Sequence, residues 1–342
     1  MSVTTELLES PQSLALAERL MSEVCTGSKL DWLGPVVQEH LNAGGKRVRA
    51  RLALATVAAL GGAATDGVAW AAACELLHNA SLVHDDLQDG DRYRRGELAV
   101  WARYGAAQAI NAGDLLLMLP FLAIDRASID DASKWKLSRL LARGGESIVR
   151  GQAAELNLVR LGQTQWAAYE GAVLGKTAAL FTMPVAGAAI CAGWSAPEAE
   201  TLGEALAPLG LAFQIADDLL DLYGDKGREP ATDLVEGRVN AVVVHHLALH
   251  PQDRDRLLTL LRCPRGETSA IEVELFRHRF QSRGAVQAVQ ARLDSIERTL
   301  TEDLRLAAAP ALRKVVLALF RLATVNTSSR RPPVSSNLRM QS

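Results

Sequence analysis

Two acidic clusters with the same internal spacing are the residues of this chain with the clearest chemistry. The first is Asp85-Asp86-Leu87-Gln88-Asp89 and the second is Asp217-Asp218-Leu219-Leu220-Asp221. Each follows an apolar stretch, which indicates a largely buried helix. On a helix, the first and last aspartates of such a cluster lie about one turn apart on the same face. Each cluster can therefore project a pair of carboxylates from the end of a helix.

Two such helices facing each other would surround one cavity with carboxylates. That much negative charge in a confined space requires cations. All-oxygen ligands suit Mg²⁺ that bridges to a phosphate of the substrate. A single cluster of this kind is typical of a solvated acidic face, but two copies, each after an apolar stretch, favour a Mg²⁺ site.

The elements that would position these clusters are helices. Helical periodicity recurs along the chain, and no alternating pattern indicates a strand. We therefore expect an all-α fold, a helical bundle around a central cavity, with residues 1–325 as one domain and 326–342 as a disordered tail. The expected helices are 12–24, 29–43, 47–60, 66–88, 103–124, 132–159, 164–174, 176–192, 197–223, 236–249, 251–262, 267–281, 284–306 and 309–324.

The bulk composition excludes several classes of protein. The residues are 49% hydrophobic and 5% aromatic, with much alanine, which favours close-packed helices. A formal net charge of −2 gives no reason to expect nucleic-acid binding. The four cysteines are scattered, which predicts a reducing compartment and hence the cytoplasm. The N-terminus lacks a signal-peptide core, and the absence of about twenty uninterrupted apolar residues predicts no membrane span.

Basic and polar residues flank the acidic clusters. Gly44-Gly45-Lys46-Arg47-Val48-Arg49 sets three cations after a glycine pair at an expected helix start, where a diphosphate can approach closely. Such a string alone is more often a solvated face. Arg94-Arg95-Gly96 follows the first acidic cluster, and its guanidinium groups can neutralise phosphate oxygens. Lys176-Thr177 begins an apolar helix, and Gln214 precedes Asp217 by about one turn.

With these residues together, the chain resembles the trans-isoprenyl diphosphate synthases, a family of chain-elongating prenyltransferases. The resemblance runs from Gly44 to about Gly237 and rests on the order of its motifs. They are Gly44 to Arg49, His78, Asp85 to Asp89, Arg94-Arg95-Gly96, Asn111 to Asp114, Gly151-Gln152, Lys176-Thr177, Phe213 to Asp218, Asp233-Leu234 and Glu236-Gly237.

The resemblance implies a reaction between isopentenyl diphosphate and an allylic diphosphate, joined head to tail. The allylic diphosphate ionises with the help of Mg²⁺, the double bond of isopentenyl diphosphate attacks the cation, and a proton is lost. The protein would stabilise the leaving group and exclude water, without a nucleophile of its own.

The resemblance also implies roles for individual residues. Asp85, Asp89 and Asp217 would bind Mg²⁺, supported by Asp86, Asp218, Asp221 and Asp233. The allylic diphosphate would be held by Arg94, Lys176, Gln214 and Arg228. Isopentenyl diphosphate would be held by Lys46, Arg49, His78 and Arg95. The backbone carbonyls near Lys176 and Thr177 would stabilise the cation, whereas His84 and the pair His245-His246 would be structural.

Four positions depart from the family's pattern. Glu97 to Val100 replace the usual Pro-Thr after Arg94-Arg95-Gly96, and Glu155 stands where an aspartate is usual. The segment Gly227 to Asp233 lacks the usual second glycine, and Arg238-Val239-Asn240-Ala241-Val242 replaces the usual Lys-x-Thr-Leu-Pro. These changes leave the aspartates intact but alter the loop over the allylic site.

The length of the product is expected to depend on the residues before Asp85. The growing chain would run along the helix from Asp85 toward its N-terminus, past Ser81 and Ala80, and then past Leu77. Because Ser81 and Ala80 are small, the resemblance implies a product of twenty or more carbons, and Ala80→Phe is expected to shorten it.

Two other functions share parts of this pattern. A class I terpene cyclase has the same fold and ionisation step, but usually carries an Asn/Ser/Glu motif on the second helix. An inactive regulatory subunit of a heteromeric synthase commonly lacks one aspartate cluster. The family also implies a homodimer, for which the apolar helix 103–124 is a candidate interface, although plain core explains its composition equally well.

Overall fold

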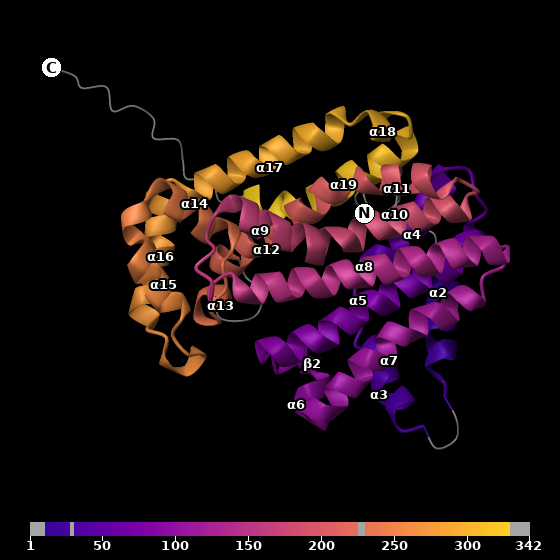
Figure 1. The fold of residues 1–342 in the computed structure, drawn as a ribbon, viewed down its shortest axis with the longest axis horizontal. Coiled ribbons are helices and arrows are strands. Elements are labelled where there is room, and N and C mark those ends of the chain that lie inside the picture. Colours follow the sequence, from indigo (N-terminus) through magenta and orange to yellow (C-terminus); the bar gives the residue numbers. More distant parts are fainter. Residues whose placement is uncertain (1–10, 28–30, 225–229, 329–342) are drawn as a thin grey trace.

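The computed structural model describes residues 11–27, 31–224 and 230–328. Helices dominate it, which confirms the expected all-α fold (Figure 1). The helices are α2 Pro11–Cys25, α3 Leu33–Asn42, α4 Val48–Ala59, α5 Val68–Asp89, α6 Val100–Tyr104, α7 Ala106–Asp125, α8 Asp131–Asn157, α9 Trp166–Val173, α10 Ala179–Cys191, α11 Ala196–Glu204, α12 Ala207–Tyr223, α13 Thr232–Val235, α14 Ala241–Leu249, α15 Arg254–Leu261, α16 Ala270–Ser282, α17 Ala285–Glu302, α18 Leu304–Ala307 and α19 Pro310–Ser328. Short helical turns are η1 Ala64–Gly67, η2 Leu174–Ala178, η3 Pro251–Asp253 and η4 Arg265–Glu267.

The helix α5 forms the centre of the bundle. Every residue from Ala69 to Leu77 is buried, because alanines on all sides let neighbouring helices approach closely. Figure 1 shows α8 running through the middle of the molecule, α17 along one edge and α14 to α16 at one end. The indole of Trp70 donates a hydrogen bond of 3.0 Å to the carbonyl of Pro184, which joins α5 to α10. The C-terminal end of α5 therefore projects from a rigid core.

Several local expectations were wrong. The expected helix 236–249 begins only at Ala241, and the expected helix 284–306 divides at Asp303 into α17 and α18. Residues 197–223 form two helices, because the chain turns between Glu204 and Ala207 and Pro208 stands in the first turn of α12, where proline is favoured. Residues 103–124 also divide, since Gly105 has a φ of 87°. The short strands β1 Tyr93–Arg94 and β2 Glu97–Leu98 pair in an antiparallel hairpin. Its two loop residues, Arg95 and Gly96, both have positive φ, as a tight hairpin turn requires, and two-residue strands leave no periodic signal.

Two helical stretches are long and apolar enough to cross a membrane by length and composition alone. They are Ala106–Asp125 and Trp166–Cys191, of whose apolar windows 44% and 72% are buried inside the molecule. The core helix of a globular protein has the same properties, so the prediction of no membrane span stays a prediction. The helix α19 continues to Ser328, three residues past the expected domain end, and residues 329–342 lie outside the described part of the chain.

Candidate active site

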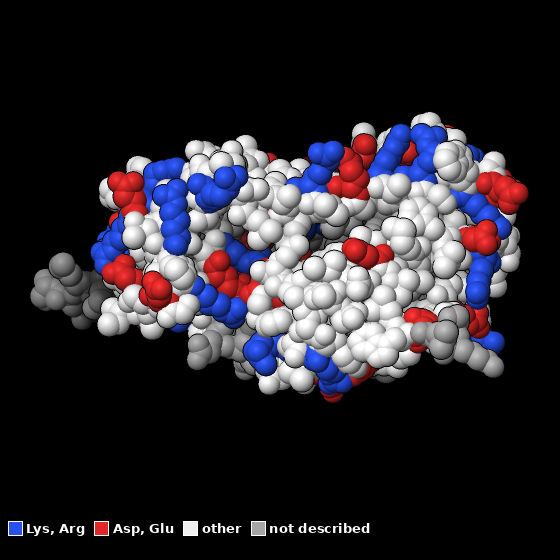
Figure 2. Space-filling view, turned by 60° about the horizontal axis from the view of Figure 1, so that its bottom comes forward, with Lys and Arg blue, Asp and Glu red and all other residues white. Residues whose placement is uncertain are grey.

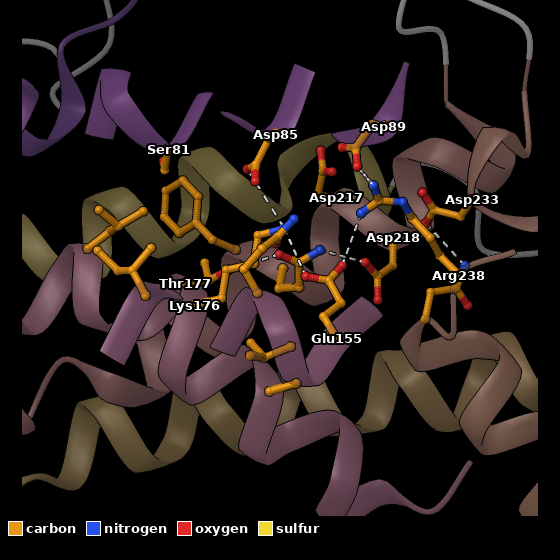
Figure 3. A pocket seen from close by; sticks show the side chains of 18 of the residues that line it. Ser81, Asp85, Asp89, Glu155, Lys176, Thr177, Asp217, Asp218, Asp233 and Arg238 are labelled. Carbon is orange, nitrogen blue, oxygen red and sulfur yellow. Dashed lines mark hydrogen bonds and ion pairs between the residues drawn. The ribbon is translucent and has the colours of Figure 1, made fainter. Parts of the chain in front are cut away.

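A cavity of about 380 Å³ lies where the C-terminal ends of α5 and α12 face α8 and η2. Asp85 and Asp89 line it from α5, and Asp217 and Asp218 line it from α12 (Figure 3). The two acidic clusters, 132 positions apart in the sequence, therefore share one cavity. Among the described residues, no three acidic, histidine or cysteine side chains converge closely enough to form a ready-made metal site.

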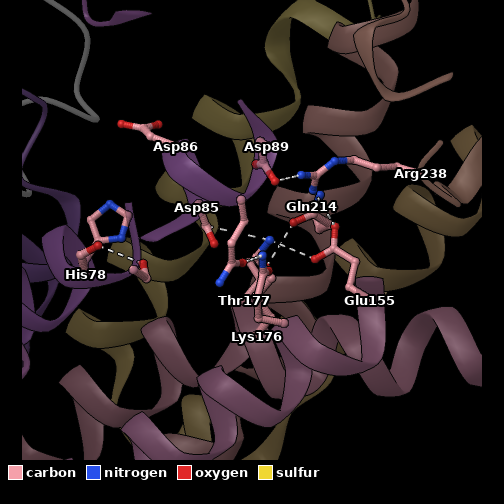
Figure 4. Close-up of polar contacts among 12 residues, drawn as sticks. His78, Asp85, Asp86, Asp89, Glu155, Lys176, Thr177, Gln214 and Arg238 are labelled. Atoms are coloured by element: carbon pink, nitrogen blue, oxygen red, sulfur yellow. Dashed lines mark hydrogen bonds and ion pairs between the residues drawn. The ribbon is translucent and has the colours of Figure 1, made fainter. Parts of the chain in front are cut away.

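The first cluster divides between two faces of α5. Asp86 is buried, does not line the cavity and points away from Asp85 (Figure 4), and its carboxylate accepts a hydrogen bond of 2.8 Å from Nε of Arg94. Burial raises the pKa of Asp86, although the hydrogen bond from Arg94 opposes this effect. Asp86 therefore positions Arg94 and does not face the other aspartates. The helix ends directly after Asp89, because Gly90 adopts the left-handed conformation that closes a helix C-terminus.

Lys176 enters the cavity from a π-helical turn. Such turns widen a helix and occur frequently at functional sites. The turn packs against Gly151 of α8 so closely that a Cβ atom there would lie 2.1 Å from the backbone nitrogen of Lys176. Only glycine fits at position 151. The close contact between the two backbones fixes the position of Lys176 relative to α8. Next to it, the hydroxyl of Thr177 donates a hydrogen bond of 3.0 Å to the side chain of Gln214.

Glu155 of α8 connects the basic side chains of the cavity. Its carboxylate lies 2.8 Å from Nζ of Lys176 and 3.2 Å from Nη1 of Arg238. Burial opposes the charge of Lys176, but the carboxylates of Glu155 and Asp85 outweigh it and raise the pKa of Lys176. Arg238 also contacts the carboxylate of Asp89 directly. The sequence motifs did not predict that Glu155 or Arg238 belongs to the site. Both residues were noted only because they differ from the family's usual pattern.

Asp218 and Asp221 on α12 are held by surrounding polar groups. Asp218 accepts hydrogen bonds of 2.6 Å from the Tyr169 hydroxyl, 2.9 Å from Gln214 and 2.7 Å from the backbone nitrogen of Ala241. Burial nevertheless raises the pKa of Asp218. Asp221 is also buried and accepts a hydrogen bond of 3.0 Å from the backbone nitrogen of Asp233. Asp221 is not among the residues that line the cavity, and Tyr169 had no signal in the sequence.

A basic region adjoins the cavity at the start of α4. Arg49, His78 and Arg94 line the cavity. The Arg49 guanidinium lies 5.1 Å from the centre of the Phe181 ring, and no partner for its Nε is present among the described residues. Burial, followed by the charge of Arg49, lowers the pKa of His78 well below its usual range. Arg49, His78 and Arg94 can therefore donate hydrogen bonds to the oxygens of a diphosphate.

The remaining basic residues expected at the site lie at its edge or outside it. Arg95 donates a hydrogen bond to the carbonyl of Gly44, and its guanidinium lies over Gly45. Lys46 is exposed and does not line the cavity. Arg228 lies outside the described residues. Among the residues expected to limit chain length, Ser81 lines the cavity, Leu77 lines an adjoining one, and Ala80 is fully buried and lines neither.

Among the histidines expected to be structural, His245 and His246 do not line the cavity, whereas His84 stands next to Asp85 and lines an adjoining cavity with it. His246 is buried and bonded to Asp253 at 2.9 Å, and His245 packs against the Trp166 ring at 5.1 Å between centres. Nε2 of His84 lies 3.6 Å from Asp114 on α7.

Over most of its length, the chain is similar to known polyprenyl and isoprenyl diphosphate synthases in both sequence and structure. The family model described as polyprenyl synthetase matches residues 30–276. A short chain isoprenyl diphosphate synthase from Methanothermobacter thermautotrophicus is 36% identical over 243 residues, 70% of this chain and 74% of that protein. A geranylgeranyl diphosphate synthase from Saccharolobus solfataricus is 33% identical over 225 residues, 64% of this chain and 68% of that protein. The crystal structure of a geranylgeranyl pyrophosphate synthetase from Pyrococcus horikoshii has a TM-score of 0.79 at 27% identity, covering 95% of this chain and 98% of that one.

Proposed function

Because the chain belongs to the polyprenyl synthetase family and is a chain-elongating trans-prenyltransferase, we propose that it makes a linear polyprenyl diphosphate of twenty or more carbons. Its substrates are isopentenyl diphosphate and an allylic diphosphate, joined head to tail. The observation that carries the proposal is that carboxylates from α5 and α12 share one cavity with Lys176, Arg49 and His78. The name of the relative from Saccharolobus solfataricus supports a twenty-carbon product.

Members of this family generally use a divalent metal, and we propose Mg²⁺ here. Asp85, Asp89 and Asp217 would hold it, because they present carboxylate oxygens to the cavity from both sides. The lack of a ready-made three-residue site among the described residues fits Mg²⁺, which is usually bound by one or two carboxylates together with phosphate oxygens and water. When bound, the metal supplies positive charge that stabilises the departing diphosphate.

The side chains of the protein bind and orient the two diphosphates. Lys176, Arg94 and Gln214 line the cavity and would hold the allylic diphosphate, with Arg228 as a further proposed contact. Arg49 and His78 would hold isopentenyl diphosphate, with Lys46 and Arg95 at the edge. His78 suits this role as a neutral donor, since its lowered pKa keeps it uncharged at neutral pH.

The allylic cation must be protected from water and stabilised near its terminal carbon. Lys176 and Thr177 of the π-helical turn line the cavity, and their backbone carbonyl groups would face this carbon. Leu180 and Phe213 form an apolar wall beside them. Low polarity strengthens the electrostatic stabilisation of the leaving group and keeps water from quenching the cation.

We further propose a homodimer through α7 and α8. Figure 2 shows a broad face with few charged side chains, turned forward from the lower edge of Figure 1, where α7 lies. Ile110, Met118 and Leu122 form an exposed stripe along α7, with exposed fractions of 48%, 57% and 54%. Val149 on α8 is 59% exposed. A second copy of the chain would cover this apolar surface. We also propose a cytoplasmic location.

Labelled isopentenyl diphosphate tests the proposed function directly. The purified protein is incubated with Mg²⁺ and allylic primers of five, ten, fifteen or twenty carbons, and the product lengths are read by mass spectrometry. Linear diphosphates that grow by five carbons are expected. No incorporation with any primer, in protein shown to be folded, would contradict the proposal and favour a regulatory subunit. Cyclised hydrocarbon from an allylic diphosphate alone would indicate a terpene cyclase.

A further inference from the structure

A second cavity adjoins the catalytic one. It has a volume of about 210 Å³ and lies between α5, α7 and α8. Four residues line both cavities, namely Ser81, Asp85, Ile148 and Gln152. The two spaces therefore meet beside the first aspartate of the first cluster, and a molecule anchored in the catalytic cavity can extend into the second.

The lining of this second cavity changes from polar to apolar with distance from Asp85. Its polar residues, His84, Asp85, Gln88 and Gln152, stand at the end that adjoins the catalytic cavity. Leu77 and Gly145 face each other at the inner end, and Leu117 and Val149 also line the cavity. Leu156 follows Gln152 by one turn of α8 and therefore lies at the end near Gln88. Leu77 lies eight residues before Asp85, so the inner end is about 12 Å from that carboxylate along α5. This polarity fits the hydrocarbon tail of a molecule whose charged end is held among the aspartates.

Gly145 lies in the wall of the inner part, within α8. A glycine inside a helix costs about 1 kcal/mol relative to alanine, so its presence there needs a reason. At Gly144 and Gly151 the reason is close packing, because a Cβ atom would lie 2.6 Å from Met183 Sδ and 2.1 Å from the Lys176 nitrogen, respectively. At Gly145 a Cβ atom would meet only Leu77 Cδ1, at the ordinary distance of 3.8 Å. Packing does not require glycine at position 145.

We propose that Gly145 determines the length of the product, by leaving open the space opposite Leu77 into which the growing chain extends. The inference rests on the proposed function, because it assigns the second cavity to the product of that reaction. A side chain at position 145 would project toward Leu77 and close the inner part of the cavity. Elongation would then stop at a shorter chain, while the first condensation, near Asp85, would continue.

The test compares Gly145→Leu with a matched glycine, Gly171 of α9. Gly171 is also helical, is exposed, meets nothing within 4 Å of a Cβ atom and lines neither cavity. With labelled isopentenyl diphosphate and a ten-carbon primer, Gly145→Leu is expected to lower the longest product by at least one five-carbon unit. Its first condensation is expected to stay within a few-fold of the unmodified protein. Gly171→Leu is expected to leave the product lengths unchanged.

Gly145→Ala provides a smaller change in case the leucine variant does not fold. It is expected to raise the melting temperature, because alanine favours the helix, and to shift the product distribution toward shorter chains. Unchanged product lengths in a folded, active Gly145→Leu variant, or loss of the first condensation in that variant, would overturn the inference. If the unmodified protein makes no product with any primer, the proposed function itself has failed, which is a different result.

Discussion

The carboxylate of Glu155 lies 3.2 Å from the guanidinium of Arg238. Both residues stand where the sequence departs from the pattern of the family it resembles, with glutamate for aspartate and arginine for lysine. Arg238 also contacts Asp89, and Glu155 contacts Lys176 at 2.8 Å. The two departures thus form one ion pair, which links an aspartate of the first cluster to the lysine expected to bind diphosphate.

Arg238→Gln is expected to lower kcat/KM by about 10- to 100-fold, because a charged hydrogen bond contributes about 1.5–3 kcal/mol and its loss leaves Asp89 and Glu155 without this cation. Arg238→Lys is expected to retain most of the activity. Steady-state kinetics with varied allylic primer measures the effect. Arg256→Gln, which removes an ion pair with Glu272 on the exposed surface, serves as the control. Equal kinetics for Arg238→Gln and the unmodified protein would show that the ion pair has no role in the reaction.

Asp217→Asn is expected to reduce kcat by about 10²- to 10³-fold, the usual effect of removing one group that stabilises transition-state charge. The concentration of Mg²⁺ needed for half-maximal rate is expected to rise as well. A Mg²⁺ titration of the residual activity measures both. Asp294→Asn on α17 changes an exposed carboxylate and is expected to have no effect. If Asp217→Asn keeps full activity and an unchanged Mg²⁺ requirement, Asp217 is not a metal ligand.

Ser81→Phe is expected to shorten the product, because Ser81 lines both cavities beside Asp85. Ala80→Phe, the substitution that the motif spacing suggested, is expected to act mainly on stability. Ala80 is fully buried and lines neither cavity, so a phenyl ring there overpacks the core at a cost of about 1–3 kcal/mol. Product lengths and melting temperatures of the two variants separate these effects. A shorter product from Ala80→Phe with an unchanged melting temperature would restore the original expectation.

The protein is expected to lose stability below about pH 6.5, partly through His40. Burial, with the charges of Arg95 and Arg94, lowers the pKa of His40 to about 4. In the unfolded chain this histidine takes up a proton as the pH falls through 6.5, whereas in the folded protein it stays neutral until about pH 4. The unfolded state therefore binds more protons in this window, and His40 costs about 2 kcal/mol of stability between pH 7 and pH 5.

His40→Gln removes this titration, so its free energy of unfolding is expected to fall less between pH 7 and pH 5 than that of the unmodified protein. Urea denaturation at each pH measures the difference. His278→Gln on α16 replaces an exposed histidine and is expected to leave the pH dependence unchanged. An identical pH dependence for His40→Gln and the unmodified protein would contradict the expectation.

Met118→Asp combined with Leu122→Asp is expected to convert a dimer into a monomer, because both side chains lie on the exposed apolar stripe of α7. Sedimentation velocity reads the mass of each form. Ile271→Asp on α16 replaces an apolar side chain that is 83% exposed, but lies on a different helix. A monomeric unmodified protein, or a dimer in both variants, would exclude this interface.

Most of the helices could be predicted from the sequence, because a helix depends mainly on the pattern of residues close together in the chain. Helical periodicity and glycine breakers placed the expected helix 66–88 within two residues of α5, Val68–Asp89. The shared spacing of the two acidic clusters also predicted that carboxylates project from helix ends. The hairpin at Arg95-Gly96 was missed because its strands have two residues each. The break between α11 and α12 was missed because Leu202, Leu206 and Leu209 keep the spacing of one helix across it.

The sequence by itself determined the helical class, the paired aspartates and the basic motifs, since these depend on residues close together in the chain. Only the tertiary structure decided which of these residues meet. Glu155 on α8 and Arg238 after α13 are 83 positions apart, and nothing in their local sequence brings them together. Likewise, the helical spacing places Ser81 and Ala80 on neighbouring faces of α5. The packing of α7 and α8 against α5 decides that Ser81 lines the cavities, whereas Ala80 is buried in the core. A helix's periodicity defines its faces, whereas contacts between helices distant in sequence decide which face borders the cavity.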